Sequence, residues 1–193
     1  MDEQLKKRLQ ALEQEKDHLK KSLLFLGILT EAIKSEGIKP VLVGGRALEF
    51  YTLGGYATKD IDIILNGRTR AGIALKEMGF QKNPGERHWY HEELDIALEI
   101  PGDYLAGSIE KLTVVEIGGM ECYIIGVEDL IVDRLAAAKF WGVETDLQWA
   151  AKILALNIYD IDADYLGEAA QKAGVDDFLK KVWEQCRFYL NND

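Results

Sequence analysis

The feature that most constrains the fold of this chain is the alternation at residues 60–65, where two acids interleave with aliphatic residues. In a β-strand, residues two apart point to the same side of the sheet. Asp60 and Asp62 therefore share one face, while Ile61 and Ile63 turn to the other face and enter a core. Because neighbouring carboxylates repel and are costly to bury without a counter-charge, the pattern favours either a solvated strand face or a divalent-cation site.

The residues before this strand add a second constraint. An apolar, strand-like run at residues 41–43 stops at Gly44-Gly45, and a short helical pattern follows. Glycine lets the backbone approach a ligand closely, and N–H groups at the start of a helix can hold a phosphate. A phosphate cradle followed by paired acids indicates phosphoryl or nucleotidyl transfer. Oxygen-only ligation favours magnesium, with manganese as the alternative.

A third strand is predicted from the alternation over residues 93–100. Asp95, Ala97 and Glu99 would share one of its faces, opposite a row of aliphatic residues. A carboxylate on a strand next to residues 60–65 would complete a metal site or act as a general base on a hydroxyl. An exposed acidic strand face is the alternative.

The succession of elements predicts an α/β (α+β) protein with a mixed sheet. A helix is expected over residues 68–78 and a hairpin over 112–125, turning at its Gly-Gly pair. From residue 127 onward the chain is helical in pattern. We therefore expect an N-terminal helix at 1–36, an α/β domain at 37–126 and a helical domain at 127–193.

Residues 2–35 are predicted to form one continuous helix. Leucines recur along it at alternating steps of four and three, which is the heptad pattern of a coiled-coil seam. The seam favours either a homodimer or docking within the chain, and the sequence leaves both open. Its members are Leu5, Leu9, Leu12, Leu19, Leu23 and Leu26.

Composition excludes some classes of partner and compartment. The net charge of −10 does not favour duplex DNA, because binding to a duplex depends on neutralising phosphates with Lys and Arg. No apolar run approaches the roughly 18 residues needed to span a membrane, and the charged N-terminus lacks a secretory signal. Cys122 and Cys186 belong to no CxxC pair, so we expect free thiols in a reducing, cytoplasmic setting.

Three segments together resemble the nucleotidyltransferase superfamily related to DNA polymerase β. They are residues 43–45 (VGG), 58–62 (TKDID) and 94–96 (LDI). Residues 126–137 also resemble the stretch that opens the helical half of small prokaryotic members, including those of toxin–antitoxin systems. The resemblance covers about residues 38–150 and implies that fold, with a helical half after the sheet.

The resemblance also implies roles for individual residues. Three carboxylates would be catalytic and would bind two magnesium ions, and a second group would bind a nucleoside triphosphate. The catalytic and metal-binding residues are Asp60, Asp62 and Asp95, and the nucleotide-binding residues are Gly44, Gly45, Arg46, Thr58, Lys59 and Arg134.

Three positions depart from the family pattern. Arg46 stands where a small residue is common, Tyr56 where an Arg is common, and Trp149 where a second acid is common. The implied activity is transfer of a nucleoside monophosphate to an unidentified hydroxyl on RNA, protein or a small molecule. The alternatives are a catalytically lapsed interaction partner, for example in a toxin–antitoxin pair, and a nucleotide-binding regulator.

Overall fold

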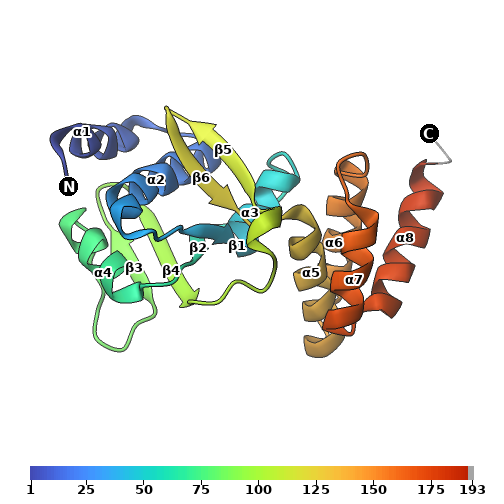
Figure 1. Ribbon diagram of the computed structural model, residues 1–193. Coiled ribbons are helices and arrows are strands. Elements are labelled where there is room, and N and C mark those ends of the chain that lie inside the picture. The colour runs from blue at the N-terminus through green and yellow to red at the C-terminus, as the bar shows by residue number, and fades with distance from the viewer. Residues whose placement is uncertain (191–193) are drawn as a thin grey trace.

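A six-stranded mixed sheet lies at the centre of the N-terminal two-thirds of the chain (Figure 1). The computed structural model describes residues 1–190. The strand order across the sheet is β3-β4-β2-β1-β6-β5. The strands are β1 (Val41–Val43), β2 (Asp60–Ile64), β3 (His88–His91), β4 (Ile96–Gly102), β5 (Thr113–Ile117) and β6 (Met120–Ile124).

The pairing makes the sheet mixed, as the sequence predicted. Strand β1 runs antiparallel to β2 and parallel to β6, and β2 runs parallel to β4. The edge pairs β3–β4 and β5–β6 are antiparallel, and β5–β6 is the predicted Gly-Gly hairpin. The two strands that carry the site residues, β2 and β4, therefore run side by side in the same direction.

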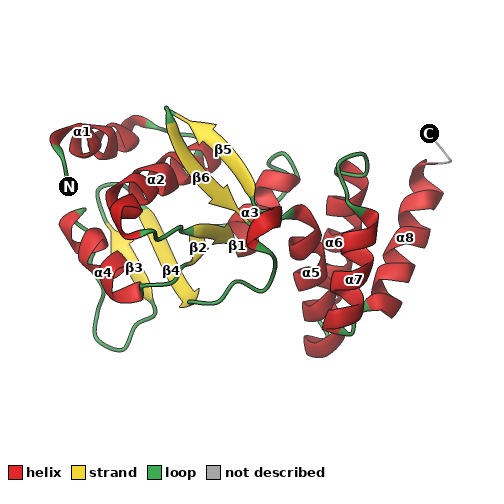
Figure 2. Cartoon of the chain, in the orientation of Figure 1, coloured by secondary structure: helices red, strands yellow, loops and turns green. Residues whose placement is uncertain are grey.

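The helices separate into a group in the sheet half and a group that follows it (Figure 2). Helix α2 is apolar on nearly every side, so the chain buries it: Phe25, Leu26 and Leu29 are fully covered. It packs against β6 and α4. The first group is α1 (Glu3–Ala11), α2 (His18–Ile33), α3 (Gly44–Tyr51) and α4 (Arg68–Glu77), and the second is α5 (Val127–Trp141), α6 (Glu144–Leu156), α7 (Ala163–Ala173) and α8 (Asp176–Leu190).

The prediction of one continuous N-terminal helix is wrong. Helix α1 ends in a short 3₁₀ turn, the chain becomes extended at Glu15, and α2 begins after Asp17. Asp17 is the N-cap, and its carboxylate accepts a hydrogen bond from the Lys20 N–H. Leu12 and Leu26 of the predicted seam are buried against the rest of the chain. These leucines are therefore docked within one chain, while a homodimer through this segment stays a prediction.

Two strand predictions also need correction. The polar segment before residue 92 forms β3, for which the sequence pattern predicted no strand. A tight turn over residues 92–95 then reverses the chain into β4, so β4 begins at Ile96 rather than at residue 93. Asp95 lies in that turn with φ of +51°, and its N–H donates to the Glu92 carbonyl.

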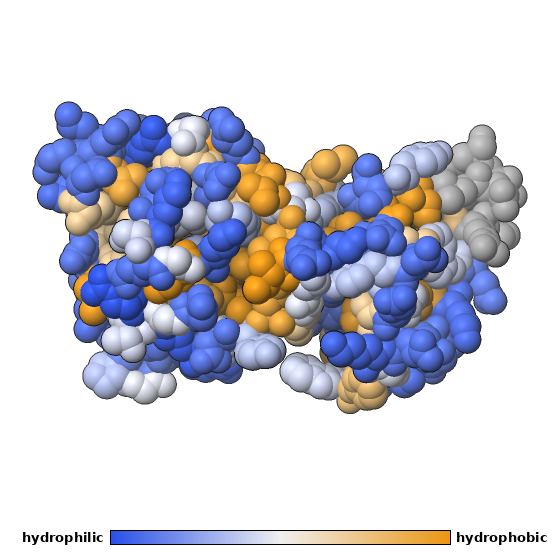
Figure 3. Space-filling view, viewed as in Figure 1, coloured by the Kyte–Doolittle hydropathy of each residue, from blue (hydrophilic) through white to orange (hydrophobic). Residues whose placement is uncertain are grey.

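The chain becomes helical at residue 127, as the sequence pattern predicted. Helix α5 spans residues 127–141 and is followed by Gly142, which adopts the left-handed conformation. Hydrophobic side chains gather on the surface where this half meets the sheet half (Figure 3). No helix within residues 1–190 is long and apolar enough to cross a membrane. Cys122 and Cys186 are both free and buried.

Candidate active site

Three carboxylates lie on one face of two neighbouring strands. Asp60 and Asp62 alternate with buried Ile61 along β2. The register of the parallel β2–β4 pair places Asp62 opposite Glu99 and Asp60 opposite Ala97. Because paired residues in a sheet point to the same side, Glu99 joins the two aspartates on their face.

Asp95, the predicted third carboxylate, is placed elsewhere. It precedes β4, is exposed, and lies in the turn from β3 rather than opposite Asp60 or Asp62. The sequence pattern that suggested Asp95 also contains Glu99, which lies four residues later and shares a face with Asp95 in the predicted strand. Sequence alone does not give the register between two strands, so it could not indicate which of the two acids faces Asp62.

The electrostatics of these carboxylates show that they interact. Partial burial raises the pKa of Asp62, and the negative charges of Glu99 and Asp60 raise that pKa further. Glu99 forms ion pairs with two basic side chains of the β3 segment, although its buried Oε1 accepts no hydrogen bond from residues 1–190. Arg87 Nε lies 2.8 Å from Glu99 Oε1, and His88 Nε2 lies 3.2 Å from Glu99 Oε2. Positive charge at His88 and Arg134 acts on the pKa of Asp62 in the opposite direction.

The glycine pair stands directly against the carboxylates. Helix α3 begins at Gly44, which has φ of +63°. A Cβ on Gly44 would lie 2.5 Å from Asp62 Oδ2, and a Cβ on Gly45 would lie 3.2 Å from the Thr58 Cβ. Among the described residues, no side chain caps the first turn of α3. The first turn of α3 therefore starts beside Asp62 with its N–H groups uncapped by any side chain.

Arg46, which follows Gly45 in α3, is almost completely buried. Its guanidinium pairs with Glu49, with 2.5 Å between Nη1 and Oε2, and donates to the Lys59 carbonyl at 3.3 Å. The buried Arg46 Nε has no hydrogen-bond acceptor among residues 1–190. Arg46 therefore supports the segment leading into β2 and retains one unused donor.

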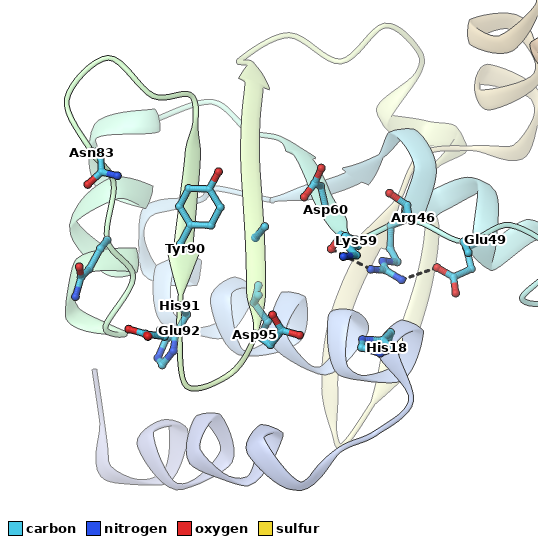
Figure 4. A pocket seen from close by; sticks show the side chains of 15 residues that line it. His18, Arg46, Glu49, Lys59, Asp60, Asn83, Tyr90, His91, Glu92 and Asp95 are labelled. Atoms are coloured by element: carbon cyan, nitrogen blue, oxygen red, sulfur yellow. Dashed lines mark hydrogen bonds and ion pairs between the residues drawn. The ribbon is translucent and has the colours of Figure 1, made fainter.

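A cavity of about 780 Å³ opens beside Asp60. It extends from Arg46 and Lys59 over the open face of the sheet to Tyr90 and Asp95 (Figure 4). Thr58 and Lys59, both predicted to bind nucleotide, border this cavity, as does Asp60. His18, the first residue of α2, also borders the cavity (Figure 4).

Arg134, also predicted to bind nucleotide, reaches the site from the helical half. Its guanidinium forms ion pairs with Asp133 and with Asp146 of α6, the latter at 3.0 Å. These carboxylates keep the Arg134 pKa above its ordinary value in spite of burial. Arg134 is therefore a fixed positive charge whose influence extends to Asp62 across the boundary between the two halves.

Two of the positions that depart from the family pattern contact each other. Tyr56, after α3, and Trp149, on α6, pack edge to face with ring centroids 5.0 Å apart. Tyr56 also covers Gly45, since a Cβ there would lie 3.0 Å from the tyrosine ring. An aromatic contact thus links the α/β half to α6 next to the start of α3.

The donor chemistry at Asp60, Asp62 and Glu99 fits a hard divalent cation. All three ligands offer oxygen, and a cation between them would relieve the repulsion that raises the pKa of Asp62. Within residues 1–190, no three His, Cys, Asp or Glu side chains are already arranged around one point as a formed metal centre. The three carboxylates therefore have the ligand atoms that such a cation prefers, and they lie on the same face of the sheet.

The fold of the chain is nucleotidyltransferase-like, as its similarity to two solved structures shows. No protein-family model and no curated protein sequence matches the chain. Among solved structures, an antigenic nucleotidyltransferase-like protein from Paracoccidioides brasiliensis superposes with a TM-score of 0.55 at 15% identity, covering 88% of this chain and 93% of that one. ANT(2″)-Ia in complex with adenylyl-2″-tobramycin superposes with a TM-score of 0.51 at 13% identity, covering 75% and 92%. At identities of 15% and 13%, the structural similarity establishes the fold alone.

Proposed function

We propose that this protein is a magnesium-dependent nucleotidyltransferase that moves a nucleoside monophosphate from a nucleoside triphosphate to a hydroxyl acceptor. The observation that carries the proposal is the in-register placement of Asp62 and Glu99 on parallel strands, with Asp60 on the same face and Gly44 against Asp62. The crystal structure of ANT(2″)-Ia with an adenylylated product supports it by analogy of fold.

In this proposal Asp60, Asp62 and Glu99 hold the metal. Glu99 takes the third position that the sequence assigned to Asp95. Magnesium bound there would supply the positive charge that activates the acceptor hydroxyl and stabilises leaving pyrophosphate. The N–H groups of the first turn of α3, beginning at Gly44-Gly45, would donate hydrogen bonds to phosphate oxygens, since no side chain of the described residues caps them.

The reaction would proceed by one in-line displacement. The acceptor oxygen bonds to the α-phosphorus, the bond from that phosphorus to the bridging oxygen breaks, and pyrophosphate leaves. The acceptor's proton passes to a carboxylate of the group, of which Asp60 borders the cavity. The acceptor would occupy that cavity, whose volume of about 780 Å³ accommodates a small molecule or one end of a polymer.

Nucleotide titrations with and without magnesium test the proposal. The double variant Asp60→Asn/Asp62→Asn should lose magnesium-dependent affinity for nucleoside triphosphates by about tenfold or more. Glu99→Gln should weaken it as well, whereas Asp95→Asn, a matched change on the turn, should bind like the unmodified protein. Thermal unfolding checks that each variant is folded.

Unchanged magnesium-dependent binding in the folded double variant would refute the proposal. If Asp95→Asn weakens magnesium-dependent binding as much as Glu99→Gln does, Asp95 would instead belong to the metal-binding group. Mass spectrometry of candidate acceptors after incubation with the triphosphate and magnesium then detects transfer, and distinguishes an enzyme from a nucleotide-binding regulator.

One observation favours a second candidate, an interaction protein that keeps the fold without catalysis. The Tyr56–Trp149 contact covers Gly45, where a nucleotide's phosphates would approach. A partner in a toxin–antitoxin pair remains a proposal of this class. Absence of any triphosphate binding by the unmodified protein, with or without magnesium, would favour this candidate over the enzyme.

A further inference from the structure

The start of β2 lacks a strand neighbour on the side of β1. Strand β1 ends at Val43, which pairs with Asp62, and the chain then turns into α3. In that antiparallel register the neighbour of Asp60 would be Gly45, but Gly45 is helical. On its other side Asp60 pairs with Ala97 of β4. One side of Asp60 therefore has no strand partner.

The side chain of Arg46 reaches this end of β2 from α3. Its Nη2 donates to the carbonyl of Lys59, the residue directly before Asp60, at 3.3 Å. Its Nη1 lies 2.5 Å from Oε2 of Glu49, which is one turn further along α3. Figure 4 shows both contacts, with the guanidinium between Glu49 and the start of β2. Arg46 therefore joins the helix that begins at the glycine pair to the peptide before Asp60.

The segment between α3 and β2 has few other attachments. Residues 53–55 and Ala57 are exposed, and Leu53 adopts the left-handed conformation with φ of +53°. Residues 56–59 make no backbone–backbone hydrogen bond with any residue of the described chain. Within residues 1–190, Arg46 is also the only donor to the Lys59 carbonyl. The peptide before Asp60 is therefore held mainly by one side chain.

Stability alone gives little reason for a buried arginine at this position. The Arg46 side chain is 3% exposed, and its Nε has no acceptor among the described residues. Burying a charge is costly, and a donor left without a partner adds to that cost. Buried ion pairs can often be replaced by apolar residues without loss of stability. The contribution of Arg46 therefore lies in what its guanidinium holds, which is the start of β2 beside the cavity.

We propose that Arg46 is a positioning residue for the metal ligand Asp60. It fixes the peptide before Asp60, so that the Asp60 carboxylate stays beside that of Asp62. The proposal rests on the proposed nucleotidyltransferase function, and it replaces the nucleotide-binding role that the sequence resemblance implied for Arg46. Metal affinity depends on partners that orient the ligands, so loss of the Arg46 contact should weaken magnesium binding.

Two measurements on Arg46→Met test the proposal. In the metal-free protein, hydrogen exchange at the Asp60 amide should quicken several-fold, because the preceding peptide loses its donor. The magnesium concentration that half-saturates ATP binding should rise about tenfold, whereas ATP affinity without magnesium should stay within about twofold. Arg70→Met is the matched control, since Arg70 also pairs with a glutamate, Glu36, but is exposed on α4. The control should change neither quantity.

A double variant separates the position of Asp60 from the stability of the protein. Arg46→Met alone leaves the largely buried Glu49 without its partner, which destabilises the folded state. In Arg46→Met/Glu49→Leu both charges are gone, so the free energy of unfolding should largely recover. The Lys59 carbonyl still lacks its donor, and the half-saturating magnesium concentration should therefore stay raised about tenfold.

Three outcomes would overturn the role of Arg46 while the proposed function stands. The half-saturating magnesium concentration of the double variant returns to that of the unmodified protein, which means that Arg46 acts only through stability. Exchange at the Asp60 amide stays unchanged in both Arg46 variants. ATP binding weakens equally with and without magnesium. If the unmodified protein shows no magnesium-dependent binding of ATP or another nucleoside triphosphate, the proposed function and this inference are both overturned.

Discussion

At the scale of single residues, the site depends on what is absent from Gly44. Its φ of +63° lies in the left-handed region, and Asp62 Oδ2 occupies the space where a Cβ would stand. A side chain there would be strained by the backbone and would also displace the carboxylate. The same glycine therefore allows the first turn of α3 to start against β2 and keeps Asp62 in place.

Replacement of two glycines separates these effects. Gly37 has a nearly identical φ of +68°, but a Cβ there would meet nothing within 4 Å. Gly37→Ala should lower the free energy of unfolding by about 1–2 kcal/mol, the usual cost of left-handed backbone for alanine. Gly44→Ala should cost at least about 1 kcal/mol more, because the added methyl group forces Asp62 to move.

Urea denaturation gives both values, and nucleotide titration shows whether Gly44→Ala also loses magnesium-dependent binding while Gly37→Ala does not. Equal destabilisation by the two variants would mean that the contact with Asp62 carries no cost beyond the backbone.

The sequence predicted these residues unequally well. Asp60 and Asp62 could be placed on one face because strand alternation is local. The partner Glu99 could not be selected over Asp95, because that choice depends on register between strands far apart in the chain. The contact between Tyr56 and Trp149 joins residues on different halves, and no local pattern predicts it.

At the scale of elements, the N-terminal segment shows how a capping residue overrides a periodic pattern. The leucine spacing continues across residues 15–17, yet Asp17 starts a new helix by accepting from the Lys20 N–H at 2.9 Å. The break lets α2 enter the core, whereas α1 contributes only Leu9 to it. Strand β3 was missed for the converse reason: its residues are polar, and only pairing with β4 makes them a strand.

Loss of the Asp17 cap should therefore affect the core. Asp17→Ala should lower the free energy of unfolding by about 1 kcal/mol, because the first turn of α2 loses its acceptor. Asp2→Ala removes the equivalent cap of α1, whose carboxylate accepts from the Leu5 N–H at 2.8 Å. Since the end of α1 can fray without opening the core, Asp2→Ala should cost less in urea denaturation. A larger loss from Asp2→Ala would contradict this order.

At the scale of the whole molecule, the two halves are joined by a buried polar group at the start of α5. Asp129 Oδ2 accepts from the Ser108 N–H at 2.9 Å, and Asp129 Oδ1 accepts from the Tyr165 hydroxyl at 2.7 Å. One carboxylate thus ties the loop after β4 to α7. Glu128, its neighbour, accepts from the Asp162 N–H at 2.8 Å. Because the proposed nucleotide site draws on both halves, this group holds Arg134 and α6 in position relative to the carboxylates on the sheet.

Tyr165→Phe tests the importance of this connection. Removing the hydroxyl leaves a buried oxygen of Asp129 without its donor, which should lower the free energy of unfolding by about 1–3 kcal/mol. Tyr159→Phe is the matched control, since Tyr159 is 96% exposed and its hydroxyl should contribute nothing measurable. In Tyr165→Phe, hydrogen exchange should also quicken at the Ser108 amide, as Asp129 is held less firmly. If the two variants unfold at the same urea concentration and exchange alike, Asp129 does not fix the two halves, and their arrangement must depend on apolar contacts and the Tyr56–Trp149 pair.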